Sequence, residues 1–179
     1  TNPADENNLI ELGTRSLLIE DGKKLILIDC GLGNKQDDKF FGHYSLWGDD
    51  SLDKNLKKFG FVKEDITDVF LTHLHFDHRG GAVEWNDDKS GYRAAFKNAH
   101  FWTNANHWKS ATEPNPREKA SFLKENILPL EESGQLNYLP LPITGNYGFG
   151  PDFENGCHFC RWTYGKTNVA CSSVSGKNN

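Results

Sequence analysis

Residues 69–81 read VFLTHLHFDHRGG, in which four polar side chains follow directly on an apolar run. The apolar run predicts a buried strand, and alternate side chains of a strand share a face, so the first three polar residues point the same way. A turn at the Arg-Gly-Gly that follows brings the fourth to the same side. The four residues are His73, His75, Asp77 and His78.

The chemical types of these four side chains indicate a metal site. Imidazole and carboxylate groups together suit zinc, iron or manganese. One histidine alone is more often a surface or hydrogen-bonded residue than a ligand, but three histidines and an aspartate at this spacing predict ligation. Four ligands from one turn can serve two adjacent ions with a water between them. Such a water loses its proton near neutral pH and becomes a nucleophile.

The N-terminal part of the chain predicts strands that alternate with a helix. The segment RSLLIEDGKKLILIDCGLGN reads as two strands joined by an Asp-Gly turn. Residues Leu25–Ile28 are continuously apolar, which predicts a strand buried on both faces. A short helix is expected over residues 52–59, capped by Asp50 or Ser51 and closed by Gly60.

The clearest helix signal lies further along the chain. In NPREKASFLKENILPL, Asn115 can cap a helix, Pro116 fits its first position and Glu118 completes a capping box. Pro129 is expected to end or kink this helix. Strands that alternate with helices give an α/β fold class.

The segment THLHFDH resembles the His-x-His-x-Asp-His signature of the metallo-β-lactamase superfamily. The strand that ends at Asp29-x-Gly31 resembles that family's second landmark, and the likeness runs from about Asn8 to about Gly150. The resemblance implies an αββα sandwich, of which this chain would hold only the N-terminal part. A partial domain of this kind is therefore expected over residues 1–154.

The resemblance also implies a role for each polar residue. His73 and His75 would bind the first metal, and Asp77 and His78 would bind the second. Asp29 would hold the site together from outside the ligand set. Asp77 would be catalytic as well, because it can steer the bridging hydroxide and pass a proton to the leaving group. The expected cofactor is zinc, with two ions per complete domain, and iron or manganese are the alternatives.

Residues 107–130 resemble the helical insert of the quorum-quenching lactonase and organophosphate-hydrolase branch of that family. The implied function is a metal-dependent hydrolase in which a metal-bound hydroxide attacks a lactone or ester carbonyl. Two alternatives stay open: a glyoxalase-type thioesterase or redox member of the same fold, and an inactive metal-binding fragment. The segment can also be a packing helix without a role in substrate choice.

Other residues with chemical potential receive structural interpretations. The remaining histidines in this region, His43, His100 and His107, are each expected to be structural rather than ligating. Cys30 lies at a strand end and is expected to act as a small buried apolar residue. Four aromatic residues either line a substrate pocket or fill the core: Phe96, Phe101, Trp102 and Trp108.

The charge of the chain bears on its partners. The formal net charge is −5, whereas a nucleic acid or an anionic membrane surface attracts a basic face, so neither is an expected partner. No apolar run reaches the ~18 residues of a membrane span. The expected partner is a small-molecule substrate, the cytoplasm is the default location, and the sequence carries no signal for an oligomeric state.

The chain is expected to be incomplete at both ends. It has no methionine, so its first residue is not an initiator, and it lacks the Gly-His that supplies the family's next ligand. Residues 155–179 carry three of the four cysteines, no acidic residue and no predicted strand, and their CHFC spacing is half of a zinc ribbon without its partner pair. A one-base slip near Glu154 or Asn155 would let the next frame read a strand ending in Gly-His. We therefore expect an aberrant, frameshifted tail and an inactive truncated chain.

Overall fold

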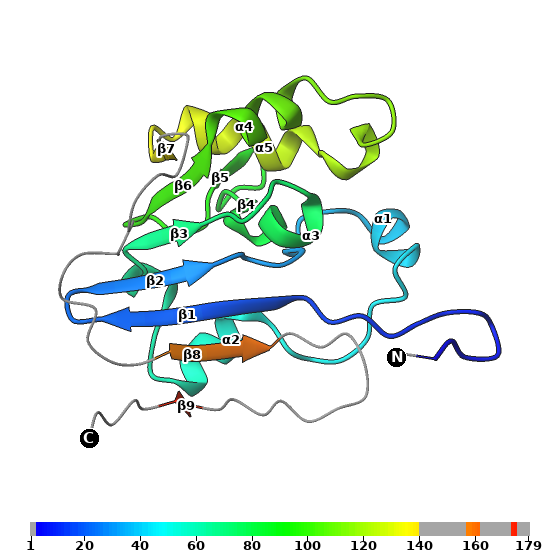
Figure 1. The fold of residues 1–179 in the computed structure, drawn as a ribbon, viewed down its shortest axis with the longest axis horizontal. Coiled ribbons are helices and arrows are strands. Elements are labelled where there is room, and N and C mark those ends of the chain that lie inside the picture. The colour runs from blue at the N-terminus through cyan, green and yellow to red at the C-terminus, as the bar shows by residue number, and fades with distance from the viewer. Residues whose placement is uncertain (1–2, 140–156, 162–172, 175–179) are drawn as a thin grey trace.

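The computed structural model describes residues 3–139, 157–161 and 173–174. Its strands form a seven-stranded sheet in the order β7-β6-β3-β2-β1-β8-β9 and a separate two-stranded sheet, β4-β5 (Figure 1). The neighbours β2, β3, β6 and β7 run parallel, and β1 lies antiparallel to β2. Strands alternate with helices along the chain, which confirms the α/β class.

Strands, α-helices and short 3₁₀ helices make up the regular structure of the described residues. The strands are β1 Arg15–Asp21, β2 Lys24–Ile28, β3 Asp68–Phe70, β4 Val83–Trp85, β5 Tyr92–Ala94, β6 His100–Asn104, β7 Leu136–Leu139, β8 Cys157–Arg161 and β9 Ser173–Val174. The α-helices are α1 Asp38–Gly42, α2 Leu52–Lys58, α3 Phe76–Arg79, α4 Ala105–Thr112 and α5 Lys124–Glu132. The 3₁₀ helices are Lys63–Asp65, Gly80–Ala82 and Lys119–Ser121.

The hairpin of β1 and β2 forms at the Asp-Gly turn, as predicted. Asp21 pairs with Lys24 across the turn, and Gly22 between them has a φ of +55°. The prediction that β2 is buried on both faces is confirmed, because three consecutive residues of the strand are buried: Leu25, Ile26 and Leu27. A strand covered on both faces can hold the residue that follows it in a fixed place.

Helix α2 also follows its sequence signals. The hydroxyl of Ser51 accepts a hydrogen bond from the main-chain nitrogen of Lys54 at 3.2 Å, so Ser51 is the cap. Gly60, with a φ of +81°, follows the end of the helix. Leu52 and Leu56 are buried in the hydrophobic core of the sheet and helices.

The helix predicted from Asn115 begins later than expected. Asn115 accepts hydrogen bonds from the main-chain nitrogens of Arg117 and Glu118, but the chain then makes only a 3₁₀ turn, and α5 starts at Lys124. A cap stabilises the first turn of a helix but does not propagate it against a tertiary contact. Phe122 lies at the break, where its side chain packs against the core.

Pro129 does not end the helix either. It lies inside α5, which continues to Glu132. Proline at this position removes the hydrogen bond that its own nitrogen would have donated to the carbonyl of Glu125, and its ring crowds that carbonyl. Packing of the buried residues Ile127 and Leu130 against the core holds the helix together across this gap.

One difference from the sequence prediction lies in the C-terminal tail. Residues Cys157–Arg161 form β8, which pairs antiparallel with β1, although no strand was predicted there. Without β8, the described part of β1 would be a sheet edge with unpaired N–H and C=O groups, and such an edge pairs readily with an extended segment. Most of residues 155–179 lies outside the described residues, so the aberrant tail stays a prediction.

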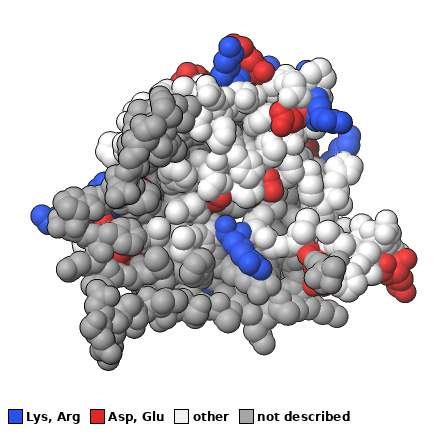
Figure 2. All heavy atoms as spheres, viewed as in Figure 1, with Lys and Arg blue, Asp and Glu red and all other residues white. Residues whose placement is uncertain are grey.

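The surface bears on the expected partners. Figure 2 shows lysine and arginine side chains at several separate places on one face, with acidic side chains among them. Among the described residues, no helix combines the length and the apolar character that crossing a bilayer requires. The expectation that the partner is neither nucleic acid nor membrane stays a prediction.

Candidate metal centre

The four predicted ligands lie where two neighbouring parallel strands end. β3 is followed by the histidine-rich segment, and β2 is followed by Asp29. The two strand ends are joined by a hydrogen bond of 2.9 Å from the main-chain nitrogen of Asp29 to the oxygen of Phe70. Helix α3 begins one residue after His75 (Figure 1). The chain is therefore not extended through Asp77, and the helix, rather than strand alternation, sets the direction of the last two ligands.

Three of the four side chains come together. One ligand atom each of His73, Asp77 and His78 lie within 4.8 Å of one another, and all three side chains are half-buried. The imidazole rings of His73 and His78 have centroids 3.8 Å apart. Nε2 of His78 lies 3.6 Å from Oδ2 of Asp77. Two imidazoles and a carboxylate at this separation form a donor set that suits zinc.

The carboxylate of Asp29 organises this group from behind. Its Oδ2 lies 2.8 Å from Nδ1 of His78 and accepts a hydrogen bond of 2.7 Å from the hydroxyl of Thr72. Its Oδ1 accepts from the main-chain nitrogen of Thr72 at 2.9 Å. Asp29 is 6% exposed and has a φ of +59°, an uncommon value for a residue with a side chain. The hydrogen bond between Nδ1 of His78 and Oδ2 of Asp29 raises the pKa of the His78 ring and directs its Nε2 toward Asp77.

Thr72 orients the other histidine of the group. Its hydroxyl hydrogen goes to Asp29, because a carboxylate can only accept, and this leaves the hydroxyl oxygen as an acceptor for Nδ1 of His73 at 3.3 Å. Nε2 of His73 is then free to bind a metal. Burial, followed by the neighbouring His78 and His75, lowers the pKa of His73 and favours the neutral ring that ligation needs.

His75 stands apart from the group of three. Its ring centroid lies 4.8 Å from that of His73, and on its other side it lies 4.9 Å from the ring of Phe122. No ligand atom of His75 belongs to the group of three. The structure thus brings three of the four predicted ligands together and places the fourth beside them.

Two glycines let the metal-binding segment pack closely. A Cβ on Gly80 would overlap the main chain of Leu32, and one on Gly81 would overlap the carbonyl of Cys30. The approach is held by a hydrogen bond of 2.6 Å from the nitrogen of Cys30 to the oxygen of His78. The Arg-Gly-Gly sequence was expected to ease a turn, but the φ of neither glycine is positive. The glycines are needed for close packing instead.

An aromatic cluster lies next to the ligands, and the sequence interpretation missed it. Phe40 lies 5.3 Å and Tyr44 lies 5.2 Å from the ring of Phe76, which precedes Asp77 directly. Phe41 lies 5.6 Å from Phe40. The available signal was the spacing of three aromatic residues around helix α1, FFGHY, a segment in which only His43 was considered.

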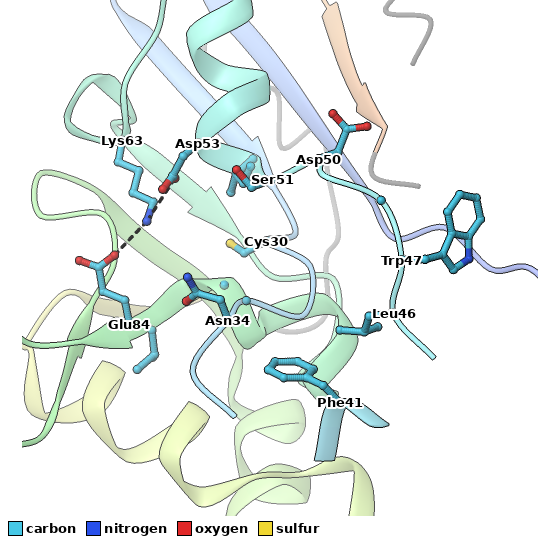
Figure 3. Close-up of a pocket in the computed structure, with 15 residues that line it drawn as sticks. Cys30, Asn34, Phe41, Leu46, Trp47, Asp50, Ser51, Asp53, Lys63 and Glu84 are labelled. Atoms are coloured by element: carbon cyan, nitrogen blue, oxygen red, sulfur yellow. Dashed lines mark hydrogen bonds and ion pairs between the residues drawn. The ribbon is translucent and has the colours of Figure 1, made fainter. Parts of the chain in front are cut away.

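A cavity of about 290 Å³ opens beside this cluster. Figure 3 shows Lys63 between Asp53 and Glu84 on one side and Phe41, Leu46 and Trp47 on the other. Nζ of Lys63 lies 3.2 Å from Oδ1 of Asp53 and 2.9 Å from Oε2 of Glu84. None of His73, Asp77 and His78 lines this cavity, so the cavity is separate from the group of three.

Cys30 and three of the four aromatic residues considered from the sequence are buried in the core. Phe96 and Phe101 are fully buried and Trp108 is 9% exposed, so these rings pack in the core. Trp102 donates from Nε1 to Oδ1 of Asp68 at 2.8 Å. Cys30 is free and buried, and burial raises the pKa of its thiol. Three other histidines lie outside the group of three: His43, His100 and His107.

Comparison with known proteins gives a consistent result. The family model of the metallo-beta-lactamase superfamily matches residues 9–151. An N-acyl homoserine lactonase from Bacillus cereus is 27% identical over 157 residues, which cover 82% of this chain and 54% of the lactonase. The chain therefore spans about half the length of the curated relative that it matches.

Solved structures share the fold. A probable metal-dependent hydrolase from Staphylococcus aureus has a TM-score of 0.71 at 24% identity, covering 88% of this chain and 57% of that one. AidC, a dizinc quorum-quenching lactonase in complex with a product, N-hexanoyl-L-homoserine, has a TM-score of 0.53 at 25% identity. That match covers 73% of this chain and 44% of AidC. The fold of the chain is that of the N-terminal part of a metallo-beta-lactamase domain, as predicted.

Proposed function

This chain belongs to the metallo-beta-lactamase superfamily, and on that premise we propose that it is a metal-dependent hydrolase of lactones or esters. The observation that carries the proposal is the convergence of His73, Asp77 and His78 in front of Asp29. Two imidazole nitrogens and a carboxylate oxygen are directed to one place, and hydrogen bonds from behind fix both rings.

We propose zinc as the cofactor, with two ions in a complete domain and iron or manganese as alternatives. The donor set fits zinc, because neutral imidazole and carboxylate are ligands that it prefers. By family resemblance, His73 and His75 would hold the first ion, and Asp77 and His78 the second. The geometry instead gathers His73 with Asp77 and His78 and leaves His75 beside them, and a comparison of His73→Ala with His75→Ala separates the two arrangements. When bound, zinc supplies a hydroxide from water at neutral pH and polarises the substrate carbonyl.

The residues of the chain then hold and move protons. Asp29 keeps the hydrogen on Nδ1 of His78, so that Nε2 stays available to a metal. The carboxylate of Asp77 is proposed to accept a proton and deliver it to the leaving oxygen, which makes Asp77 the catalytic residue. Asp77 lies in the first turn of α3, together with the ligands His73 and His78, and this position supports that role.

A small-molecule lactone with an apolar arm is the substrate class that we favour. A relative 27% identical is an N-acyl homoserine lactonase, and AidC contains an N-acyl homoserine product. The aromatic cluster of Phe40, Phe41, Tyr44 and Phe76 offers apolar surface at the start of α3, the helix that carries Asp77. Burial of an acyl chain against these rings would contribute about 0.8 kcal/mol for each CH₂ group.

One alternative is favoured by a specific observation. Only three predicted ligands converge among the described residues. A metal-binding chain without turnover is consistent with that observation. A glyoxalase-type thioesterase or a redox member of the same fold stays open as well. A cytoplasmic location and a partial domain over residues 1–154 also stay predictions.

The test combines metal binding with a substrate panel. Zinc is titrated into the metal-free chain, and ring opening of an N-acyl homoserine lactone is compared with hydrolysis of an acyl thioester. Zinc-dependent lactone hydrolysis that is abolished in Asp77→Asn supports the proposal. Faster thioester hydrolysis would replace it with the glyoxalase-type alternative, and tight zinc binding without hydrolysis of either substrate would favour the inactive chain.

A further inference from the structure

Two cationic side chains lie buried next to the metal-binding segment. Arg79 is 0% exposed and Lys35 is 4% exposed. Nη2 of Arg79 donates to the main-chain oxygen of Asn126, and Nζ of Lys35 donates to that of Gly80. The guanidinium carbon of Arg79 also lies 5.8 Å from the ring centroid of Trp108. These partners carry only partial charges, so none of them neutralises a cation.

No carboxylate among the described residues pairs with either cation within 4.0 Å. Glu125 acts on Lys35 only over a longer distance, where it favours the charged amine. A guanidinium keeps its proton in proteins, so Arg79 carries its positive charge in the interior. An unpaired buried charge costs several kcal/mol, and folded proteins pair such charges. The negative charge that Arg79 needs is therefore not supplied by the described side chains.

Unpartnered polar atoms gather in the same place. Nη2 of Arg79 donates to the main-chain oxygen of Asn126, and Oδ1 of the Asn126 side chain accepts from Nε2 of Gln36 at 3.3 Å, so these three residues form one cluster. Four buried atoms of this cluster have no hydrogen-bond partner among the described residues: Nε and Nη1 of Arg79, Nδ2 of Asn126 and Oε1 of Gln36. Three of these four atoms are donors. A ligand for this cluster must therefore accept hydrogen bonds.

We propose that the cluster of Gln36, Arg79 and Asn126 binds one small monovalent anion of the kind of chloride. Nε and Nη1 of Arg79 open on different edges of the guanidinium, so the anion takes one of them and a water takes the other. A single negative charge would neutralise the guanidinium of Arg79, which is the one of the two buried cations without an acidic neighbour. Gln36 is only half-buried, which leaves a path from solvent to the cluster.

The anion site is distinct from the metal site but touches the same helix. Arg79 ends α3, which carries Asp77 and His78. Neutralising the guanidinium would hold this helix against α5 and so stabilise the fold around the ligands. The inference does not depend on the proposed hydrolase activity, because it concerns a halide and needs no metal.

Bromide in place of chloride provides the direct test. Crystals of the full chain grown in sodium bromide are expected to show an anomalous scattering peak beside the guanidinium of Arg79. The denaturation midpoint should rise with bromide concentration when sodium gluconate keeps the ionic strength constant, because a ligand of the folded state stabilises it. A crystal without that peak overturns the proposal.

The Asn126→Asp variant tests the anion site by supplying a negative charge from a side chain of the protein. The new carboxylate places a negative charge beside Arg79, so the bromide dependence of the midpoint is expected to disappear while the fold is kept. The matched control is Lys54→Met, which removes an exposed cation paired with Asp49, and this variant should keep the bromide dependence. An Asn126→Asp protein that still responds to bromide like the unmodified chain would contradict the anion site.

Discussion

Nδ1 of His78 lies 2.8 Å from Oδ2 of Asp29, a residue 49 positions earlier in the chain. The contact exists because β2 and β3 are parallel neighbours, so the residues that follow their ends meet at one edge of the sheet. A carboxylate in this position fixes the ring and keeps Nε2 free for a metal. The pairing of β2 with β3 thus orients the His78 ring for metal binding before any metal binds.

Asp29→Asn tests that preparation. An amide can accept from only one of its two atoms, so it cannot serve Thr72 and His78 as the carboxylate does. We expect zinc affinity to fall roughly 10–100-fold, as is usual when an outer partner of a metal-binding histidine is lost. Competition titration with a chromophoric chelator measures it. Asp49→Asn, at a fully exposed ion pair, is the control and should leave zinc affinity unchanged.

The two histidines of the His-x-His pair are expected to differ. His73 belongs to the group of three with Asp77 and His78, whereas His75 packs between His73 and Phe122. His73→Ala should therefore weaken binding of the first zinc equivalent by at least tenfold more than His75→Ala. Isothermal titration of zinc into both variants gives the comparison. Equal losses would mean that His75 joins the ligand set of the first ion.

Close packing at the glycine pair gives a prediction on stability. A methyl group on Gly81 would overlap the carbonyl of Cys30, and backbone cannot move aside cheaply. We expect Gly81→Ala to lower the free energy of unfolding by about 1–3 kcal/mol, measured by urea denaturation. Gly42→Ala is the matched control, because a Cβ there meets nothing within 4 Å. A Gly81→Ala protein as stable as the Gly42→Ala protein would show that the loop can shift.

Much of the site could be predicted from sequence because its residues are close along the chain. The apolar run before His73 indicated the strand, and ligand chemistry indicated the metal. The fate of His75 could not be predicted, since it depends on Phe122, which arrives from a distant segment. The predicted start of α5 was wrong for the same reason. The cap at Asn115 is a signal from neighbouring residues, whereas the packing of Phe122 depends on contacts with distant ones.

Lys35 gives the chain a characteristic pH dependence. Burial, with a further effect of Arg79, lowers the pKa of Lys35 from its ordinary value of 10.5 to about 7. Between these values the unfolded chain binds the proton and the folded chain does not, so the free energy of unfolding rises with pH from about 7 toward 10.5. The gain is on the order of 5 kcal/mol. Lys35→Met should lack this rise.

The comparison is made by urea denaturation of both proteins from pH 6 to pH 10 in sodium gluconate. Other groups titrate in this range, so the difference between the two curves is the quantity of interest. Lys54→Met provides the reference for loss of an exposed lysine, since its ion pair with Asp49 lies at the surface. Parallel curves for the unmodified chain and Lys35→Met would sink the prediction.

The tail provides the last prediction, since β8 can be an evolved strand or an adventitious one. If residues 155–179 come from a shifted frame, β8 only occupies an edge that β1 offers, and its pairing adds little free energy. We therefore expect a chain ending at Glu154 to unfold at the same urea concentration as the full chain. The nucleotide sequence across codons 145–179 should then read, one base over, as a strand that ends in Gly-His. A loss of several kcal/mol on truncation, or codons that exclude that reading, would make β8 a true part of the sheet.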